Sequence, residues 1–189
     1  MQMGILNKQK KRKKIKMKKE LNVHEWLLKA IDKDHVQETL KCIHIEEDCS
    51  VATNGKIMNI YSKRLNDLAP GNYDSETLEK NDNIRYPNWE SVIPTNGYAF
   101  IEFQINYLVG KEDDILIFKN DKIINQRTEK LVGNYEGETD MKELCFRWDN
   151  LKCATNKIKN KFKMNIFRTN APVIIEINEN CKSIVMPKI

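Results

Sequence analysis

Histidine and carboxylate side chains can supply acid–base or metal chemistry, but their spacing here supports neither. His24, His35 and His44 form no metal-binding spacing such as HExxH, and none has a nucleophile close to it in the sequence. We interpret them as surface or hydrogen-bonded histidines. The acidic runs 46–48 and 112–114 precede or lie in expected turns, so we interpret them as solvated loop charges. The sequence also has no P-loop, GxGxxG or GxSxG motif. It therefore predicts a protein that is not an enzyme and that uses no metal and no cofactor.

The thiols lead to the same prediction. The five cysteines are Cys42, Cys49, Cys145, Cys153 and Cys181, and no two of them form a CxxC pair. An odd number without such pairs argues against a disulfide framework and a zinc site, and it suits a reducing cytoplasm. Cys153 has no partner base on its expected helix, which argues against a catalytic thiol. The enzyme alternative that stays open is a nucleic-acid-modifying site whose carboxylates come together from several strands.

The net charge of +5 is unevenly distributed. Residues 1–20 hold nine basic residues and one acidic residue, a net charge of +8, whereas residues 21–189 carry 23 basic and 26 acidic residues, a net charge of −3. We expect the basic segment to be a disordered arm with non-specific affinity for nucleic acid. Met17 is an alternative start that would remove most of this arm. Because no 18 apolar residues run together, we expect no membrane partner.

A second basic feature lies near residue 150. We expect a helix over residues 146–160, with Trp148, Leu151, Thr155 and Ile158 on its buried side. The helical wheel then exposes Asn150, Lys152, Asn156, Lys157, Lys159 and Asn160. A Lys/Asn face of this kind can contact DNA phosphates without reading bases. The predicted DNA-binding residues are Arg147, Lys152, Lys157, Lys159, Lys161 and Lys163. The alternative is an ordinary solvated helix face.

The apolar pattern places a β-α-β-β-β unit at each end of the chain. The first has an expected strand over 15–22, a helix over 23–32, and strands over 39–46, 49–53 and 56–62, with a hairpin turn at Asn54-Gly55. The second has a strand before the 146–160 helix, and strands over 162–168, 173–177 and 183–186 after it. Between the units we expect a polar connector over 65–83, an irregular segment over 86–94, and strands over 98–105, 115–118, 122–127 and 131–137. The predicted fold class is α+β, with antiparallel sheets and helices on one face.

Three segments, in order, resemble the bacterial DNA polymerase III beta sliding clamp family. Residues 40–58 are similar to its strand–turn–strand ending in ATDGHRL, here Ala-Thr-Asn-Gly-Lys-Ile-Met. Residues 86–94 (YPNWESVIP) resemble its FPDYRRVLP segment, and residues 172–189 resemble its closing strand pair ending in VMPM. Residues 140–158 fit the family's strand–helix step before those strands. The resemblance therefore extends over most of 21–189 and implies a DNA-clamp-like fold.

The resemblance also implies a hydrophobic pocket that takes a short peptide from polymerases and other replication proteins. Transferred by motif position, its lining residues are Leu40, Thr53, Gly55, Lys56, Ile57, Met58, Pro87, Val92, Ile184 and Met186. Aliphatic and methionine side chains offer an adaptable apolar cavity for Leu or Phe anchors. The alternative is that Leu40, Val92 and Ile184 are ordinary core residues. Asn54 replaces the family's usual Asp, and Lys56-Ile57 replace His-Arg, so the pocket rim differs.

The short length changes the expected architecture. The family has three domains per chain and closes a six-domain ring from two chains, whereas this chain has 189 residues. We expect a basic arm over 1–20, a clamp-like half-domain over 21–85 and a clamp-like domain over 86–189, or one elaborated domain over 21–189. This shortening, with a composition rich in Lys, Asn and Ile, fits a phage or mobile-element relative.

The implied function is a non-catalytic processivity or tethering factor. It would bind duplex DNA non-specifically as a homo-oligomer and recruit replication proteins through the peptide pocket. The alternative is a monomeric peptide-binding relative that sequesters clamp-binding proteins without encircling DNA.

Overall fold

The computed structural model describes residues 21–95, 99–105, 111–137, 143–155, 161–168 and 171–188. The predicted basic arm and the strand predicted over 15–22 therefore lie outside the described residues, apart from Leu21 and Asn22. The same holds for Ile158 and for the Lys/Asn residues 156–160 of the predicted helix face.

Among the described residues of the first half, 21–95, there are one α-helix and four strands. Its elements are α2 (Val23–Leu28), the 3₁₀ turn η1 (Glu38–Lys41), β1 (Cys42–Ile45), β2 (Ser50–Thr53), β3 (Ile57–Tyr61), the 3₁₀ turn η2 (Leu65–Asp67), β4 (Gly71–Asp74) and the 3₁₀ turn η3 (Trp89–Val92). Helix α2 starts where the Asn22 side chain accepts a hydrogen bond from the Glu25 backbone N–H, a standard N-cap. It ends at Leu28 rather than at the predicted residue 32, because the following N–H groups bond to carbonyls only three residues back.

The second half is mostly strands. Its elements are β5 (Ala99–Ile105), β6 (Ile115–Lys119), β7 (Lys122–Asn125), β8 (Leu131–Glu136), β9 (Leu144–Arg147), α3 (Trp148–Thr155), β10 (Lys161–Ile166), β11 (Val173–Asn178) and β12 (Cys181–Val185). The strands predicted over 115–118 and 122–127 are present as β6 and β7, and they form a hairpin with Asn120 and Asp121 both at positive φ in its turn. The β-α-β-β-β order predicted for the end of the chain is also confirmed, as β9-α3-β10-β11-β12.

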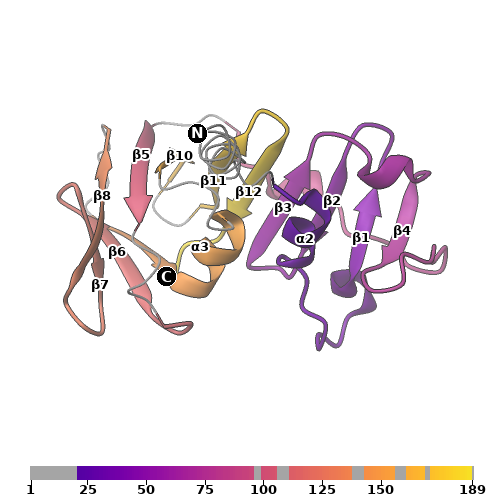
Figure 1. Ribbon diagram of the computed structural model, residues 1–189, viewed down its shortest axis with the longest axis horizontal. Coiled ribbons are helices and arrows are strands. Elements are labelled where there is room, and N and C mark those ends of the chain that lie inside the picture. The colour runs from indigo at the N-terminus through magenta and orange to yellow at the C-terminus, as the bar shows by residue number, and fades with distance from the viewer. Residues whose placement is uncertain are drawn as a thin grey trace, which may run out of the picture.

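Within the described ranges all twelve strands form one antiparallel sheet, in the order β4-β1-β2-β3-β12-β11-β10-β5-β8-β7-β6-β9. Figure 1 shows β1–β4 with α2 at one end of the molecule and β5–β8 at the other, with α3 and β10–β12 between them. Helix α2 packs on β2 and β3, and α3 packs on β3, β11 and β12. The prediction of helices on one face of antiparallel strands is confirmed. In the described part of the chain, no helix has the length and apolar character needed to cross a membrane.

The sheet has two apolar sides of unequal size. The large inner cluster lies under the helices and includes Trp26, Ile57, Trp148 and Leu151. A small outer cluster lies on the opposite side of β2, β3 and β12, and its buried members are Cys49, Val51, Met58, Ile60 and Ile184. The strand period of two explains this division, since Ile57 belongs to the inner cluster and its neighbour Met58 to the outer one.

A buried polar group joins the two halves where β3 pairs with β12. Asn59 lies opposite Ser183 in the register, and both side chains have no exposed surface. The Ser183 hydroxyl donates to Asn59 Oδ1, while Asn59 Nδ2 donates to the Trp26 carbonyl at 2.7 Å. The Trp26 indole N–H in turn donates to the Ala154 carbonyl at 2.9 Å, which connects α2 to α3. The junction therefore satisfies polar groups that would be costly to bury alone.

Three expectations about these elements were wrong. The helix predicted over 146–160 begins at Trp148, because Phe146 and Arg147 pair with β6 as part of β9. Asn150, predicted to be exposed on this helix, is buried. The connector predicted over 65–83 contains β4, which pairs with β1.

The buried polar group at the β3–β12 junction can be tested by truncation. Asn59→Ala removes the amide that bonds to the Trp26 carbonyl and to the Ser183 hydroxyl, and leaves them the longer bonds with the Lys29 N–H at 3.2 Å and the Ala154 carbonyl at 3.3 Å. We expect the free energy of unfolding to fall by about 1–3 kcal/mol. Urea unfolding followed by circular dichroism measures the change. Asn83→Ala, at an exposed loop position, is the control and should change stability by less than about 0.5 kcal/mol. Equal losses in the two variants would contradict this role for Asn59.

Candidate functional site

A row of side chains crosses the outer side of the sheet at the centre of the outer cluster. Thr53 pairs with Met58, Met58 with Ile184, and Ile184 with Ile174, on four neighbouring strands. Met58 and Ile184 are each 3% exposed, whereas Thr53 and Ile174 are half-buried. Directly paired residues of an antiparallel sheet lie about 4.5–5.5 Å apart at Cβ, so the row is a continuous surface.

The turn at one end of this row is built by side chains as well as by glycine. Asn54 Oδ1 accepts hydrogen bonds from the N–H groups of Lys56 and Ile57, an acceptor that an Asp at this position would also supply. Thr53 Oγ1 donates to the Ile57 carbonyl at 2.7 Å. Gly55 is required by its φ of +81° and not by crowding, because nothing lies within 4 Å of the place of a Cβ there. The hairpin predicted at Asn54-Gly55 is confirmed.

Residues 84–93 lie over the outer cluster as an irregular segment. Tyr86, Trp89 and Ile93 pack against the cluster that contains Met58 and Ile184. The segment contains only the 3₁₀ turn η3, which agrees with the expectation that its prolines prevent a helix or a central strand. This packing brings together two of the sequence motifs, which are separated by about 30 positions in the chain.

Hydrogen bonds and ring stacking from β1 and β4 hold this segment in place. The rings of His44 and Tyr86 stack at 4.5 Å with an interplanar angle of 7°. The Trp89 indole N–H donates to Glu46 Oε1 at 2.9 Å, and His44 Nε2 lies 3.1 Å from the same oxygen. Asn72 Nδ2 donates to the Ile84 carbonyl at 2.6 Å, and its Oδ1 lies 2.7 Å from His44 Nδ1. The segment is therefore held at three residues, Ile84, Tyr86 and Trp89.

The pKa of Glu46 lies below its ordinary value, chiefly because its carboxylate accepts the hydrogen bond from the Trp89 indole. Partial burial acts in the opposite direction, and the contact with His44 lowers the pKa further. The folded arrangement thus favours the ionised carboxylate, and the carboxylate in turn favours the docked position of Trp89.

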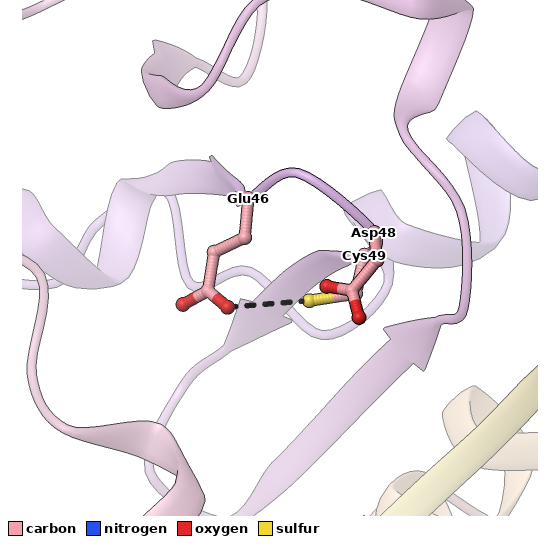
Figure 2. A group of neighbouring side chains, drawn as sticks. All are labelled: Glu46, Asp48 and Cys49. Atoms are coloured by element: carbon pink, nitrogen blue, oxygen red, sulfur yellow. Dashed lines mark hydrogen bonds between the residues drawn. The ribbon is translucent and has the colours of Figure 1, made fainter.

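Glu46, Asp48 and Cys49 form the group of side chains drawn in Figure 2. Their potential ligand atoms all lie within 4.8 Å of one another. The Cys49 thiol donates to Glu46 Oε2 at 3.6 Å. Burial and the neighbouring carboxylates raise the pKa of this thiol to about 12, so the thiol is protonated at neutral pH. Because Glu46 Oε1 accepts from the Trp89 indole, the group helps to hold residues 84–93 in place.

The ten predicted pocket residues differ in exposure and in the side of the sheet on which they lie. Met58 and Ile184 form the floor of the outer row, and Thr53 lies at its end, with Gly55 and Lys56 exposed in the adjoining turn. Val92 is 50% exposed on the docked segment, and Met186 is 39% exposed just after β12. Pro87 is exposed on the same segment, whereas Leu40 is half-buried in η1, before β1. Ile57 lies on the inner side of the sheet, so the expectation that it lines the same face as Met58 was wrong.

The final described residues fasten this site to the other half of the protein. The Met186 N–H donates to the Lys56 carbonyl at 2.9 Å, and the Lys188 N–H donates to the Cys145 carbonyl at 2.7 Å. Met186 therefore stays beside the turn that contains Gly55, two residues beyond Ile184.

Sequence reasoning missed the residues that support the segment, namely His44, Glu46 and Asn72. His44 and Glu46 are two positions apart and share one side of the chain, a signal that strand periodicity could have given. The supporting role of Asn72 could not be predicted, because residues 65–83, which contain β4, were interpreted as a connector. Beside these residues lies an open pocket of about 440 Å³, lined by His44, Glu46, Arg85, Tyr86, Pro87, Asn88, Trp89 and Glu90.

The predicted DNA-binding residues do not share one surface. Arg147 lies in β9 and pairs with Asp113 and Asp149, and Lys152 on α3 lies 3.9 Å from Glu112. Lys161 and Lys163 lie in β10, not on the helix; both alternate with Phe162 and Met164 of the inner cluster and so face outward. Lys161 pairs with Glu102 at 2.7 Å. Lys157 and Lys159 lie outside the described residues. Their role in DNA binding stays a prediction.

The described fold aligns with solved bacterial sliding clamps. The DNA polymerase sliding clamp of Caulobacter crescentus matches at 12% identity with a TM-score of 0.61, over 89% of this chain and 64% of the clamp. DNA polymerase III subunit beta of Borrelia burgdorferi, in complex with a natural product, matches at 14% identity and 0.57, over 89% and 62%. The DnaN sliding clamp of Bartonella birtlesii, bound to griselimycin, matches at 11% identity and 0.63, over 87% and 64%.

No protein-family model and no curated protein matches the chain. At these identities the alignments establish the fold, so the chain has the sliding-clamp fold that the sequence predicted. It spans less than two thirds of the length of each of these clamps.

The Glu46–Trp89 contact predicts an acid-sensitive segment. Since the pKa of Glu46 is lowered in the folded state, its stabilising contribution is present above the ordinary glutamate pKa and is lost as the pH falls through the lowered value. We expect Trp89 fluorescence to be constant from neutral pH down to that range and to change below it. Subtracting the signal of Trp89→Phe removes the contribution of Trp26 and Trp148.

The matched control is Glu46→Gln, whose amide oxygen can still accept from the Trp89 indole but does not titrate. The acid transition should be absent from this variant. An unchanged transition would show that another group controls the segment.

Proposed function

We propose that the protein is a non-catalytic tethering factor of the sliding-clamp type, which recruits a partner by binding a short apolar peptide on the outer side of the sheet. One observation carries the proposal. The docked segment 84–93 packs on the outer cluster that contains Met58 and Ile184, and two large apolar side chains stay exposed close to it in the chain: Val92 on the segment itself and Met186, two residues beyond Ile184.

The side chains at this site suit peptide anchors. Large exposed apolar side chains are few in the described residues, and two of them, Val92 and Met186, lie at this site. The methionine side chain adapts its shape to different apolar partners, whereas the branched side chain of Ile184 is rigid. A Leu or Phe anchor that enters here would bury apolar surface at about 25 cal/mol per Å². Lys56 and Thr53, at the end of the row, can bond to the peptide's polar groups.

Tethering also requires contact with DNA. In support of this part of the proposal, the fold is that of sliding clamps, and residues 8–19 hold nine basic residues and no acidic one. Among the described residues of the predicted DNA-binding set, Arg147, Lys152 and Lys161 face carboxylates, which compete with phosphates. We therefore assign most of the expected DNA affinity to the basic segment before residue 20.

The second candidate function is a monomeric peptide-binding protein that sequesters clamp-binding partners. The observation in its favour is the same pairing of Arg147, Lys152 and Lys161 with acidic residues, because the carboxylates compete with DNA phosphates for these cations.

Peptide binding can be tested with two exposed apolar residues. Val92→Asp should weaken binding of a fluorescein-labelled peptide with neighbouring Leu and Phe anchors by roughly tenfold or more, because it places a charge beside an apolar anchor. Fluorescence polarisation gives the affinity. Leu131→Asp is the matched control, because Leu131 is 55% exposed, close to the 50% of Val92, but belongs to β8. Equal affinities for the two variants, or no binding by the unchanged protein, would contradict the proposal.

DNA binding can be tested through its dependence on salt. A chain that begins at Met17 lacks seven basic residues. We expect its DNA affinity to fall, and the slope of log affinity against log salt to become shallower by up to about six. Binding to a duplex, measured by polarisation over a salt series, gives both slopes. Identical slopes would show that the segment before Met17 makes no phosphate contacts.

A further inference from the structure

The row of side chains on the outer side of the sheet continues beyond Ile174. Ile174 pairs with Asn165 of β10, and Asn165 pairs with Phe100 of β5. Asn165 and Phe100 both face the outer side, because the residues next to them along their strands that are buried belong to the inner cluster. The row therefore crosses six neighbouring strands, from Thr53 on β2 to Phe100 on β5.

Phe100 gives this row an open apolar end. Its side chain is 58% exposed, more than that of any other large apolar residue in the described strands. Strand β8 pairs with β5 on the side away from β10 and is followed there by Gly137. A Cβ added at Gly137 would lie 2.5 Å from the Phe100 carbonyl, so the chain passes close to Phe100 at a residue that has no side chain to cover it. Exposed apolar residues are common singly, but this one is aligned with the candidate site.

Asn165 supplies a polar contact between the two apolar parts of the row. Its Nδ2 donates to Glu176 Oε1 at 3.0 Å, which fixes the orientation of the amide. Its Oδ1 accepts no hydrogen bond from the described residues. This oxygen can accept from a backbone N–H of a segment that lies across the sheet.

The spacing of the strands sets the distance between the two apolar parts. From Ile184 the row takes three steps, from β12 to β11, to β10 and to β5, where it reaches Phe100. Neighbouring strands lie about 4.7–4.9 Å apart, so the three steps span roughly 14–15 Å. An extended peptide rises about 3.3 Å per residue and returns to the same side at every second residue. Two anchors four residues apart therefore span about 13 Å and match the row.

The small area at Phe100 indicates a short segment as its partner. A phenylalanine side chain can bury about 150–250 Å², whereas a stable interface between folded proteins buries about 800 Å² on each partner. Phe100 alone is far below that size. A peptide already bound at the neighbouring site needs no such area, because its second anchor adds to an existing contact.

We propose that Phe100 is a second contact point for the partner's peptide. It takes an apolar or aromatic residue that lies four positions from the anchor bound at Met58 and Ile184, and Asn165 holds the peptide backbone between them. This inference rests on the proposed function and adds to it the length and the anchor spacing of the peptide.

Peptides with and without the second anchor test the proposal. The first probe is a fluorescein-labelled peptide with neighbouring Leu and Phe anchors. Two longer probes carry a further Phe four residues before or four residues after these anchors, and each has a counterpart with Ser at that position. We expect one of the two Phe extensions to bind about tenfold more tightly than its Ser counterpart, because it buries apolar surface on Phe100. Fluorescence polarisation gives the affinities.

Phe100→Asp should remove this gain, so that the Phe and Ser extensions bind alike. Leu131→Asp is the matched control, because Leu131 is 55% exposed but lies on β8, and it should keep the gain. Phe100→Thr, whose β-branched side chain suits a strand, is a second variant in case the charge disturbs folding, which near-ultraviolet circular dichroism reports.

The outcomes separate this proposal from the proposed function. If the short peptide binds but neither Phe extension gains affinity, or if the gain persists in Phe100→Asp, this proposal is overturned and the peptide site stands. If no peptide binds, both are overturned. A second copy of the chain at Phe100 would appear in light scattering as a larger mass that Phe100→Asp abolishes and Leu131→Asp does not, and this result would also overturn the proposal.

Discussion

The pairing of β3 with β12 is the constraint on which both sides of the molecule depend. It sets Asn59 against Ser183 on the inner side, where their hydrogen bonds reach the backbone of α2. The same register sets Met58 against Ile184 on the outer side. A shift of one residue would exchange the two sides, burying apolar residues where polar bonds are needed and exposing Asn59. The buried amide therefore fixes the position of the helices and of the candidate peptide site together.

The outer site has its shape because a segment with no regular secondary structure is held over it. Tyr86 and Trp89 supply apolar area, and His44 and Glu46 hold the two rings by stacking and by an indole hydrogen bond. Aromatic rings with one polar contact combine burial with orientation, which an aliphatic residue cannot do. The segment thus covers the outer cluster, while Val92 on the segment and Met186 after β12 stay exposed.

Local signals in the sequence were sufficient for the fold and for part of the site. Strand periodicity and turn residues predicted nearly all of the strands, and the resemblance of three short motifs predicted that Met58 and Ile184 share one face with residues 86–93. The sequence could not place Ile57, because motif position does not give the side of a strand. It also missed β4, whose Gly-Asn-Tyr-Asp run is polar and is ordered by pairing with β1 and by residues 78–81. Charge alone could not show that Arg147 and Lys161 are paired with carboxylates far from them in the sequence, Asp113 and Glu102.

The methyl resonances of the methionines test the central claim, that a peptide binds on the outer side of the β3–β12 junction. Met58 belongs to the outer cluster, Met186 is exposed two residues beyond Ile184 of that cluster, and Met164 lies in the inner cluster, fully buried. In spectra of protein labelled at the methionine methyl groups, addition of a peptide with Leu and Phe anchors should shift the Met58 and Met186 signals and leave Met164 in place. Shifts confined to Met164, or no shift at saturating peptide, would contradict a partner site on this face.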